Sequence, residues 1–371
     1  MSQIKKLGDV VDFIRGITFK PEELVSLDQR DAVVCMRTKN IQERLEVDDL
    51  IAVPESFVRR DELFLQEGDV LISSANSWNL VGKVTQVPAL SYRATAGGFI
   101  AIVRAKLGAI EPNYLYRWLA SEASQAAIRS CGRQTTNISN LSVPRFLDLQ
   151  ITLPEKVEQI RVVTILEKAA SLRHKRQGAI RLSSELVRSK FSEMFGEPHT
   201  NIKGLPKTFL GDLVRLKSGN FLPSHEMAGT GGVFVYGGNG VNGEHDTAMF
   251  DEVKLVIGRV GAYCGAVHLT KPHSWITDNA LYVSEISPLV RLEYLAFALT
   301  QANLNQYSSQ SGQPLVSASR LYPVKLVLPP LSLQDAFLEV LDRTTRIQVS
   351  QTNSLEALEE MSRSLAAELF T

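Results

Sequence analysis

Two groups of polar residues stand between apolar segments of this chain, one group in each half. Arginine and lysine can donate paired hydrogen bonds to guanine, and asparagine and glutamine can pair with adenine in a similar way. Lysine, arginine, serine and threonine also bind phosphates. The candidate residues of the first half are Arg37, Lys39, Asn40, Ser74, Asn76, Trp78, Lys83, Arg133, Gln134, Thr135 and Asn137. Those of the second half are Asn239, Asn242, Arg259, Tyr263, Asn279, Gln310, Gln313 and Arg320. These residue types favour loops that contact the bases and phosphates of DNA.

No single one of these residues establishes such a contact. A polar loop residue is usually only solvated, and a tryptophan such as Trp78 packs in a core more often than it enters a groove. The hypothesis therefore depends on clusters that recur at matched places in the two halves.

The sequence contains one long internal repeat that explains the matched places. Leu-Gly-Asp-Val-Val begins the first copy at Leu7, and Leu-Gly-Asp-Leu-Val begins the second at Leu210. A Leu-Pro pair followed by a glutamine closes each copy, with Gln159 in the first and Gln334 in the second. A period this long indicates two copies of one module and not a solenoid of small repeats.

Each module has the pattern of a mixed α/β fold. Short β-rich runs bounded by Gly, Pro, Asn and Ser predict strands, and longer runs with apolar residues at helical spacing predict helices. The predicted strands are 69–72, 98–103, 233–236, 254–257 and 280–283, and the predicted helices are 113–130 and 292–306.

Two segments of about 40 residues differ in kind, because they carry apolar residues at seven-residue steps and predict long helices. Each would span roughly 60 Å and cannot bury a core alone, so we expect an antiparallel pair. Each has a polar member in the same layer, Arg173 in one and Gln348 in the other. Residues 155–198 carry nine basic and six acidic residues, whereas 331–371 carry three and seven, which favours their pairing.

The amino-acid composition excludes several classes of protein for this chain. The 371 residues include 40 basic and 40 acidic ones, so bulk charge cannot hold a nucleic acid, although local patches can. No apolar run is long enough to span a membrane, and we expect no secretory signal. Three scattered cysteines suit a reducing cytoplasm.

Three features of the sequence bear on an enzymatic interpretation. Residues 238–243 fit G-x-G-x-x-G, but the residues after them predict a strand, and a dinucleotide site needs a helix there. Asp246, Glu252 and Lys254 resemble a metal-dependent nuclease motif, but the first half has no equivalent. The histidines and cysteines lack the spacing of metal ligands. We therefore expect no catalytic, cofactor or metal site on this chain.

The order of the motifs resembles the specificity (S) subunit of type I restriction–modification systems over nearly the whole chain. The resemblance rests on LGDVVDFIRGITF and LGDLVRLKSGNFL, EGDVLIS at 67–73, VYGGNGVNG at 235–243, and the closing runs at 132–159 and 311–334. The chain departs from the family where NSWNL replaces a Gly-rich stretch, and where Pro314-Leu315 stands opposite Thr135-Thr136.

The resemblance implies two α/β target recognition domains, residues 1–154 and 199–329. Two conserved spacer helices, residues 155–198 and 330–371, would join them as an antiparallel coiled-coil-like pair with pseudo-twofold symmetry. Each domain would read one half of a split DNA target. Because the two modules differ, that target would be asymmetric.

The resemblance also implies partners and divides the chemistry among them. The helices would set the gap between half-sites and dock two methyltransferase subunits, with restriction subunits joining where the system has them. AdoMet and ATP would bind those partners, and this chain would not be an enzyme. The open alternatives are a scaffold whose modules bind proteins and a stand-alone nuclease that uses Asp246, Glu252 and Lys254.

Overall fold

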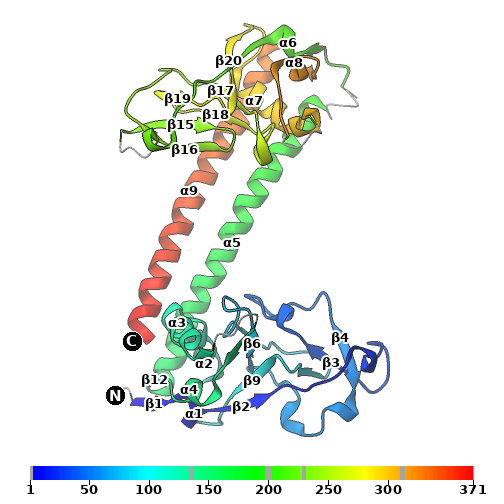
Figure 1. Cartoon of the computed structure of the whole chain (residues 1–371), viewed down its shortest axis with the longest axis vertical. Coiled ribbons are helices and arrows are strands. Elements are labelled where there is room, and N and C mark those ends of the chain that lie inside the picture. Colours follow the sequence, from blue (N-terminus) through cyan, green and yellow to red (C-terminus); the bar gives the residue numbers. More distant parts are fainter. Residues whose placement is uncertain (1–2, 134–137, 197–202, 228–230, 310–313, 371) are drawn as a thin grey trace. The chain divides into compact units, whose positions relative to one another are not determined.

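The computed structural model describes residues 3–133, 138–196, 203–227, 231–309 and 314–370 (Figure 1). The chain divides into two compact units, and each is described by itself. Unit 1 comprises Met1–Gln177 and Asn353–Thr371, and unit 2 comprises Gly178–Thr352. Two helices of 40 residues, α5 (Lys156–Phe195) and α9 (Leu331–Phe370), contribute one part to each unit.

Unit 1 is built on a four-stranded antiparallel sheet in the order β2-β9-β5-β7. Its strands are β2 (Val11–Arg15), β9 (Ile100–Ala105), β5 (Val70–Ser73) and β7 (Val84–Gln86). The second sheet comprises β4 (Ile51–Pro54), β3 (Ala32–Met36) and β8 (Ala94–Ala96). Smaller ladders join β1 (Gln3–Lys6) to β12 (Gln150–Leu153), and β10 (Gly132–Arg133) and β6 (Ala75–Asn76) to β11 (Ser139–Leu141).

The central sheet of unit 1 is buried on both faces. Successive side chains of a strand point to opposite faces, so Val70 and Ile72 enter the core beneath the helices. Leu71 enters a second core, which the strands β3 and β8 complete. The helices of the unit are α1 (Leu7–Val10), α2 (Pro112–Ala120), α3 (Glu122–Ser130) and α4 (Val143–Leu147).

The single helix predicted over residues 113–130 is wrong in one respect, because the structure breaks it at Ser121. This residue has extended backbone angles (φ −65°, ψ 150°) and ends α2. Its hydroxyl accepts a hydrogen bond from the Ser124 amide at 3.3 Å and caps α3. Serine favours such a cap over a helix interior, and that preference overrides the apolar periodicity.

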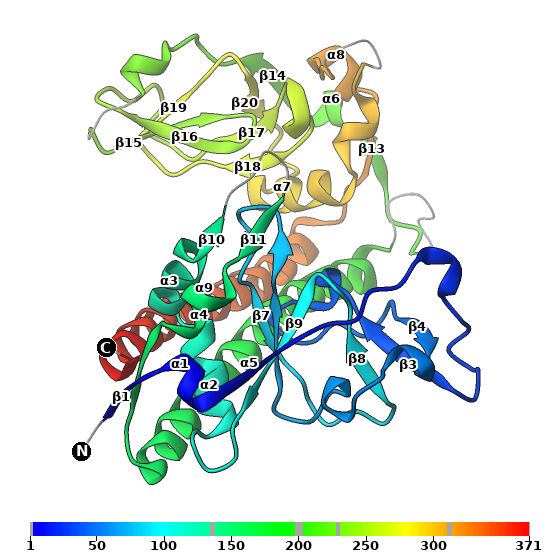
Figure 2. The same cartoon turned by 60° about the horizontal axis from the view of Figure 1, so that its bottom comes forward.

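Unit 2 repeats the plan of unit 1, with the strand order β14-β20-β17-β18 in its main sheet. These strands are β14 (Val214–Ser218), β20 (Ala280–Ile286), β17 (Leu255–Gly258) and β18 (Val267–Leu269). Figure 2 shows β15 (Val233–Gly237) and β16 (Gly240–His245) side by side, and β19 (Ser274–Ile276) completes their sheet. The remaining elements are β13 (Lys207–Phe209), β21 (Lys325–Val327), α6 (Leu210–Leu213), α7 (Leu292–Gln301) and α8 (Ala318–Leu321).

The helix in this part of unit 2 is shorter than the predicted 292–306, and α7 ends at Gln301. Asn303 has a left-handed backbone (φ 49°), and a short 3₁₀ turn, Leu304–Tyr307, follows it. The prediction of a mixed α/β fold with two similar modules and two long helices is confirmed.

The repeated motifs make the same contacts in both units. The Tyr114 hydroxyl donates to the Thr152 carbonyl at 2.9 Å, and the Tyr294 hydroxyl donates to the Val327 carbonyl at 2.9 Å. Each tyrosine is buried, so each hydroxyl needs such a partner. The repeat is therefore a repeat of packing and of hydrogen bonds as well as of sequence.

The two glutamines that follow the Leu-Pro pairs are buried at the first turns of the long helices. Gln159 accepts from the Glu111 amide at 2.9 Å and donates to the Pro154 carbonyl at 2.8 Å. Gln334 accepts from the Arg291 amide at 2.8 Å and donates to the Pro329 carbonyl at 2.8 Å. Glu111 and Arg291 are the residues that precede α2 and α7. Each glutamine thus ties a long helix to a helix of its module.

The long helices share the core of each unit and run in opposite directions there. In unit 1, Leu166 of α5 and Phe370 of α9 belong to one cluster. In unit 2, Phe195 lies 5.6 Å from Phe337 between ring centroids, and Ser184 meets Gln348. In the part of the chain that the structure describes, no helix combines the length and apolar character needed to cross a membrane.

The substitution Gln334→Ala should lower the free energy of unfolding of unit 2 by about 1–3 kcal/mol, because it leaves buried backbone groups without partners. Chemical denaturation followed by circular dichroism measures this change. Glu339→Ala, at an exposed position on the same helix, serves as the control and should change stability by less than about 0.5 kcal/mol. Equal stability of the two variants would contradict the role given to Gln334.

Candidate nucleic-acid interface

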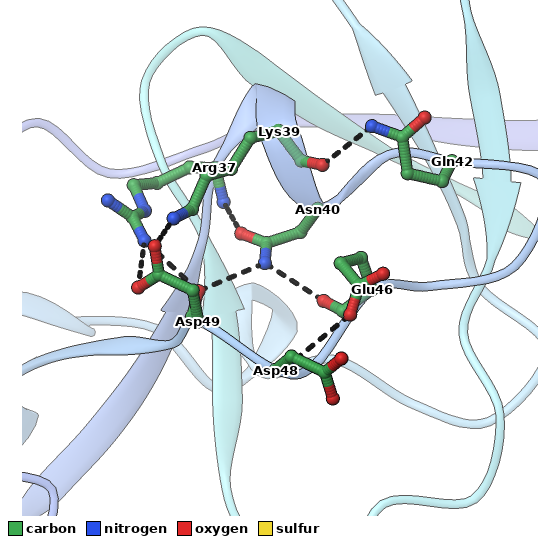
Figure 3. Close-up of polar contacts among 7 residues, drawn as sticks. All are labelled: Arg37, Lys39, Asn40, Gln42, Glu46, Asp48 and Asp49. Carbon is green, nitrogen blue, oxygen red and sulfur yellow. Dashed lines mark hydrogen bonds and ion pairs between the residues drawn. The ribbon is translucent and has the colours of Figure 1, made fainter. Parts of the chain in front are cut away.

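The loop of residues 37–49, which follows β3 in unit 1, carries three of the predicted residues (Figure 3). The Arg37 amide donates to Asn40 Oδ1 at 2.7 Å. Asn40 Nδ2 donates to the Glu46 carbonyl at 2.9 Å and to the Asp49 carbonyl at 3.3 Å. Asn40 is fully buried and its amide serves the loop itself, so a direct contact with DNA would require the loop to open.

The two cations of this loop share one carboxylate (Figure 3). Arg37 Nη2 lies 3.1 Å from Asp49 Oδ1 and donates to the Asp49 carbonyl oxygen at 3.0 Å. Lys39 Nζ pairs with the other carboxylate oxygen, Oδ2. The side chains remain 33%, 42% and 66% exposed for Arg37, Lys39 and Asp49. We call the two cations Arg37 and Lys39, which Asp49 holds, the cation fork.

The far side of the loop is anchored to the body of unit 1. Glu43 forms an ion pair with Arg173 of α5, and its carbonyl oxygen accepts from the Tyr116 hydroxyl at 3.3 Å. Gln42 Oε1 accepts from Lys83 Nζ, another predicted residue, at 2.6 Å. The loop is therefore held at several points while its cations face outward.

The two polar residues that were predicted for the same layer of the helix pair, Arg173 and Gln348, have different partners. Gln348 Nε2 donates to Ser184 Oγ across the pair at 2.8 Å, as a polar layer should. Arg173 instead pairs with Glu43 of the module. Sequence spacing placed Arg173 on the correct face of the helix but could not reveal a loop 130 positions away along the chain.

A small sheet brings the other predicted residues of unit 1 together. The strand β11 pairs with both β10, which carries Arg133, and β6, which ends at Asn76. Asn76 Nδ2 donates to Ser73 Oγ at 3.1 Å, and Trp78 is 38% exposed. Ser74 belongs to the same run. Gln134, Thr135 and Asn137 lie outside the described residues.

In unit 2 the predicted residues lie around the ends of β15, β17 and β20. Arg259 Nη1 donates to Ser218 Oγ at 3.1 Å and to the Asp278 carbonyl at 3.4 Å. Its own amide donates to the Asn279 carbonyl at 3.0 Å. Asn239, Tyr263 and, within β16, Asn242 are also exposed near these strand ends, and Arg320 is exposed on α8. Gln310 and Gln313 lie outside the described residues.

The described residues offer no geometry for the enzymatic alternatives. Glu252 pairs with Lys254 at 2.7 Å, and this hydrogen bond holds the pKa of the Glu252 carboxyl below its usual value. Among the described residues, no group of three or more His, Cys, Asp or Glu side chains could hold a metal ion. Residues 240–243 of the Gly-rich motif belong to β16 and are followed by more strand, as the sequence predicts.

Comparisons with known proteins agree with this organisation. The model of the family described as the type I restriction modification DNA specificity domain matches residues 204–360. The EcoprrI specificity subunit of Escherichia coli is 27% identical over 223 residues, which cover 57% of this chain and 54% of that protein. The StySPI specificity subunit of Salmonella potsdam is 29% identical over 154 residues, which cover 41% of this chain and 33% of that protein. The chain thus spans about half the length, or less, of these curated relatives.

Solved structures share the fold. The type I restriction–modification S subunit from M. genitalium superposes with a TM-score of 0.67 at 14% identity, and the match covers 100% of this chain and 96% of that one. A chain from a study of complex assembly and conformational transition of the type I system gives a TM-score of 0.59 at 14% identity, over 99% and 97% of the two chains. At such identities the likeness concerns the fold alone.

The family evidence also bears on the prediction that this chain is not an enzyme. The sequence relatives are specificity subunits, the non-catalytic members of type I restriction enzymes, and this confirms the prediction. Residues 204–360 thus match the type I restriction modification DNA specificity domain, and the chain is similar to type I restriction–modification specificity (S) subunits in sequence and in fold.

Proposed function

We propose that this chain reads a bipartite, asymmetric target in double-stranded DNA, with one half-site for each module. The observation that carries the proposal is the contrast between scaffold and loops. The two modules share a strand order and the same tyrosine and glutamine contacts. Their polar loops differ at matched places. The strand β3 leads into Arg37 and Lys39, whereas its counterpart β15 leads into Gly238 and Asn239, and β5 leads into Ser74, whereas its counterpart β17 leads into Arg259. One scaffold with two sets of loops suits two different DNA sequences.

The candidate residues of each module would divide the work of binding. Exposed cations such as Lys39, Arg133 and Arg320 suit phosphates, whose contacts fix position. Arginine and asparagine at loop ends, such as Arg37 and Asn279, suit base edges in the major groove. The candidates outside the described residues remain part of this proposal.

The domain limits proposed from the sequence remain part of this function. Residues 1–154 and 199–329 would form the two recognition domains, and 155–198 and 330–371 the spacer helices. The buried glutamines give each helix a fixed direction from its module, which a ruler between half-sites needs.

The spacer helices would also bind partners. Both carry apolar side chains that remain well exposed, and such surface suits docking. These are Val157, Ile160, Leu172, Leu182 and Leu186 on α5 and Ile347, Val349 and Met361 on α9. We propose two methyltransferase subunits as their partners, with restriction subunits where the system has them. AdoMet and ATP would bind those subunits, and the complex would act in the cytoplasm, where it meets DNA.

Exchange of residues 205–329 for the matching module of a relative should change one half-site and leave the other intact. The reason is that each module would carry its own contacts on a shared scaffold. The measurement is the methylation pattern left by the assembled complex on a library of duplexes. A chimera that folds and methylates an unchanged target would contradict the assignment of one half-site to one module.

Insertion of four residues in each long helix, after positions 177 and 352, should lengthen the gap between half-sites by roughly one or two base pairs. Four residues add about 6 Å of helix, and base pairs lie about 3.4 Å apart. The same four residues inserted at Gly108, in an exposed turn with open space around it, provide the control. An unaltered gap in a variant that still methylates DNA would refute the ruler.

A further inference from the structure

We propose that Asp49 is a specificity-determining residue, which orients the cation fork and restrains its charge so that non-target DNA binds weakly. This inference rests on the proposed function, because it assumes that the first module contacts DNA. Asp49 is acidic and would not itself bind a phosphate. Its support comes from the contacts within the loop of residues 37–49.

The carboxylate of Asp49 engages both cations and leaves each with donors to spare. Among the described residues, the Arg37 guanidinium meets Asp49 through Nη2 alone. Its Nε is buried without a partner, so the two donors of Nη1 are those left for DNA. Lys39 offers three donors and directs one to Asp49. The cations can therefore bind DNA while Asp49 still holds them. They would reach the DNA as an oriented pair with a local charge of one instead of two.

Orientation and charge affect target and non-target DNA differently. Binding without sequence preference depends on the number of phosphates that cations neutralise. An extra positive charge therefore strengthens binding to any duplex. Only a specific complex needs the two side chains in one geometry, and ordering long side chains during binding costs affinity. Loss of the Asp49 charge should thus favour non-target DNA while its effects on target DNA largely cancel.

The loop can survive the loss of this charge. The main-chain oxygen of Asp49 accepts from Arg37 at 3.0 Å and from Asn40 at 3.3 Å, and neither bond needs the carboxylate. Glu43 anchors the loop to Arg173 at a separate point. Asp49→Asn therefore tests the carboxylate and not the fold.

The neighbouring residue offers a matched control. Asp48 is exposed, and in the described part of the chain its contact with the loop runs through its backbone amide, which donates to Glu46 Oε1 at 3.0 Å. Its carboxylate points away from the cations in Figure 3. Asp48→Asn removes the same charge one position away without touching the cation fork.

The test measures dissociation constants for the complex of this chain with its methyltransferase subunits, as wild type, Asp49→Asn and Asp48→Asn. The probes are the selected target duplex and a scrambled duplex of equal length, each over a series of salt concentrations. Asp49→Asn should bind scrambled DNA roughly three- to tenfold more tightly, with a salt slope steeper by up to about 0.9. Its affinity for the target should stay within about twofold of wild type, and Asp48→Asn should resemble wild type.

Three results would overturn the inference. Asp49→Asn could bind scrambled DNA no more tightly than wild type, it could gain equally on both duplexes, or Asp48→Asn could match its gain. In each case the proposed function would still hold if the wild-type complex binds its target more tightly than scrambled DNA. A wild-type complex with no preference and no salt dependence would instead refute the proposed function itself.

Discussion

A buried glutamine at the first turn of each long helix fixes how that helix leaves its module. Its side-chain amide accepts from the backbone just before a module helix and donates to the carbonyl of the preceding proline. Burial makes the arrangement strict, because a buried amide must find partners for both its oxygen and its nitrogen. The contact occurs twice, with Gln159 in unit 1 and Gln334 in unit 2. Every loop that could meet DNA is held by a module that this contact ties to a helix.

The other contacts of each unit connect the helix that the glutamine holds to the strands and loops of the module. In each unit, the tyrosine of the neighbouring module helix, Tyr114 or Tyr294, donates a hydrogen bond to the last strand of the module. The central sheet then separates two apolar cores in unit 1, and polar loops follow the strands of this sheet and of the second sheet. The cation fork lies at the end of such a loop, and Glu43 links the same loop to Arg173 on α5. The candidate loop residues and the long helix α5 thus belong to one packed body within the unit.

Sequence reasoning succeeded where the determining forces are local or repeated. Apolar steps of seven predicted two long helices of about 40 residues, and α5 and α9 have 40 residues each. The repeat itself predicted two modules of one fold. The break at Ser121 was missed because one capping serine overrides a periodic pattern. The residue type of Asn40 predicts an exposed loop position, but the folded loop buries it.

The residues that sequence reasoning missed are those that act on other side chains. Asp49 stands ten and twelve positions from its two cations, and no spacing rule connects them. Arg173 was expected in the seam of the helix pair, where Gln348 does lie, and its ion pair with Glu43 depends on the tertiary fold. A candidate list drawn from residue types favours cations and amides, and it omits the carboxylates that position them.

The central claim is that two modules read two separate DNA half-sites. Selection of duplexes from a random library by the complex assembled with the proposed methyltransferase subunits tests it most directly. The account predicts two short blocks of defined bases that differ in sequence and are separated by a gap of fixed length and undefined sequence. A single continuous block, or enrichment of no sequence at all, would contradict it.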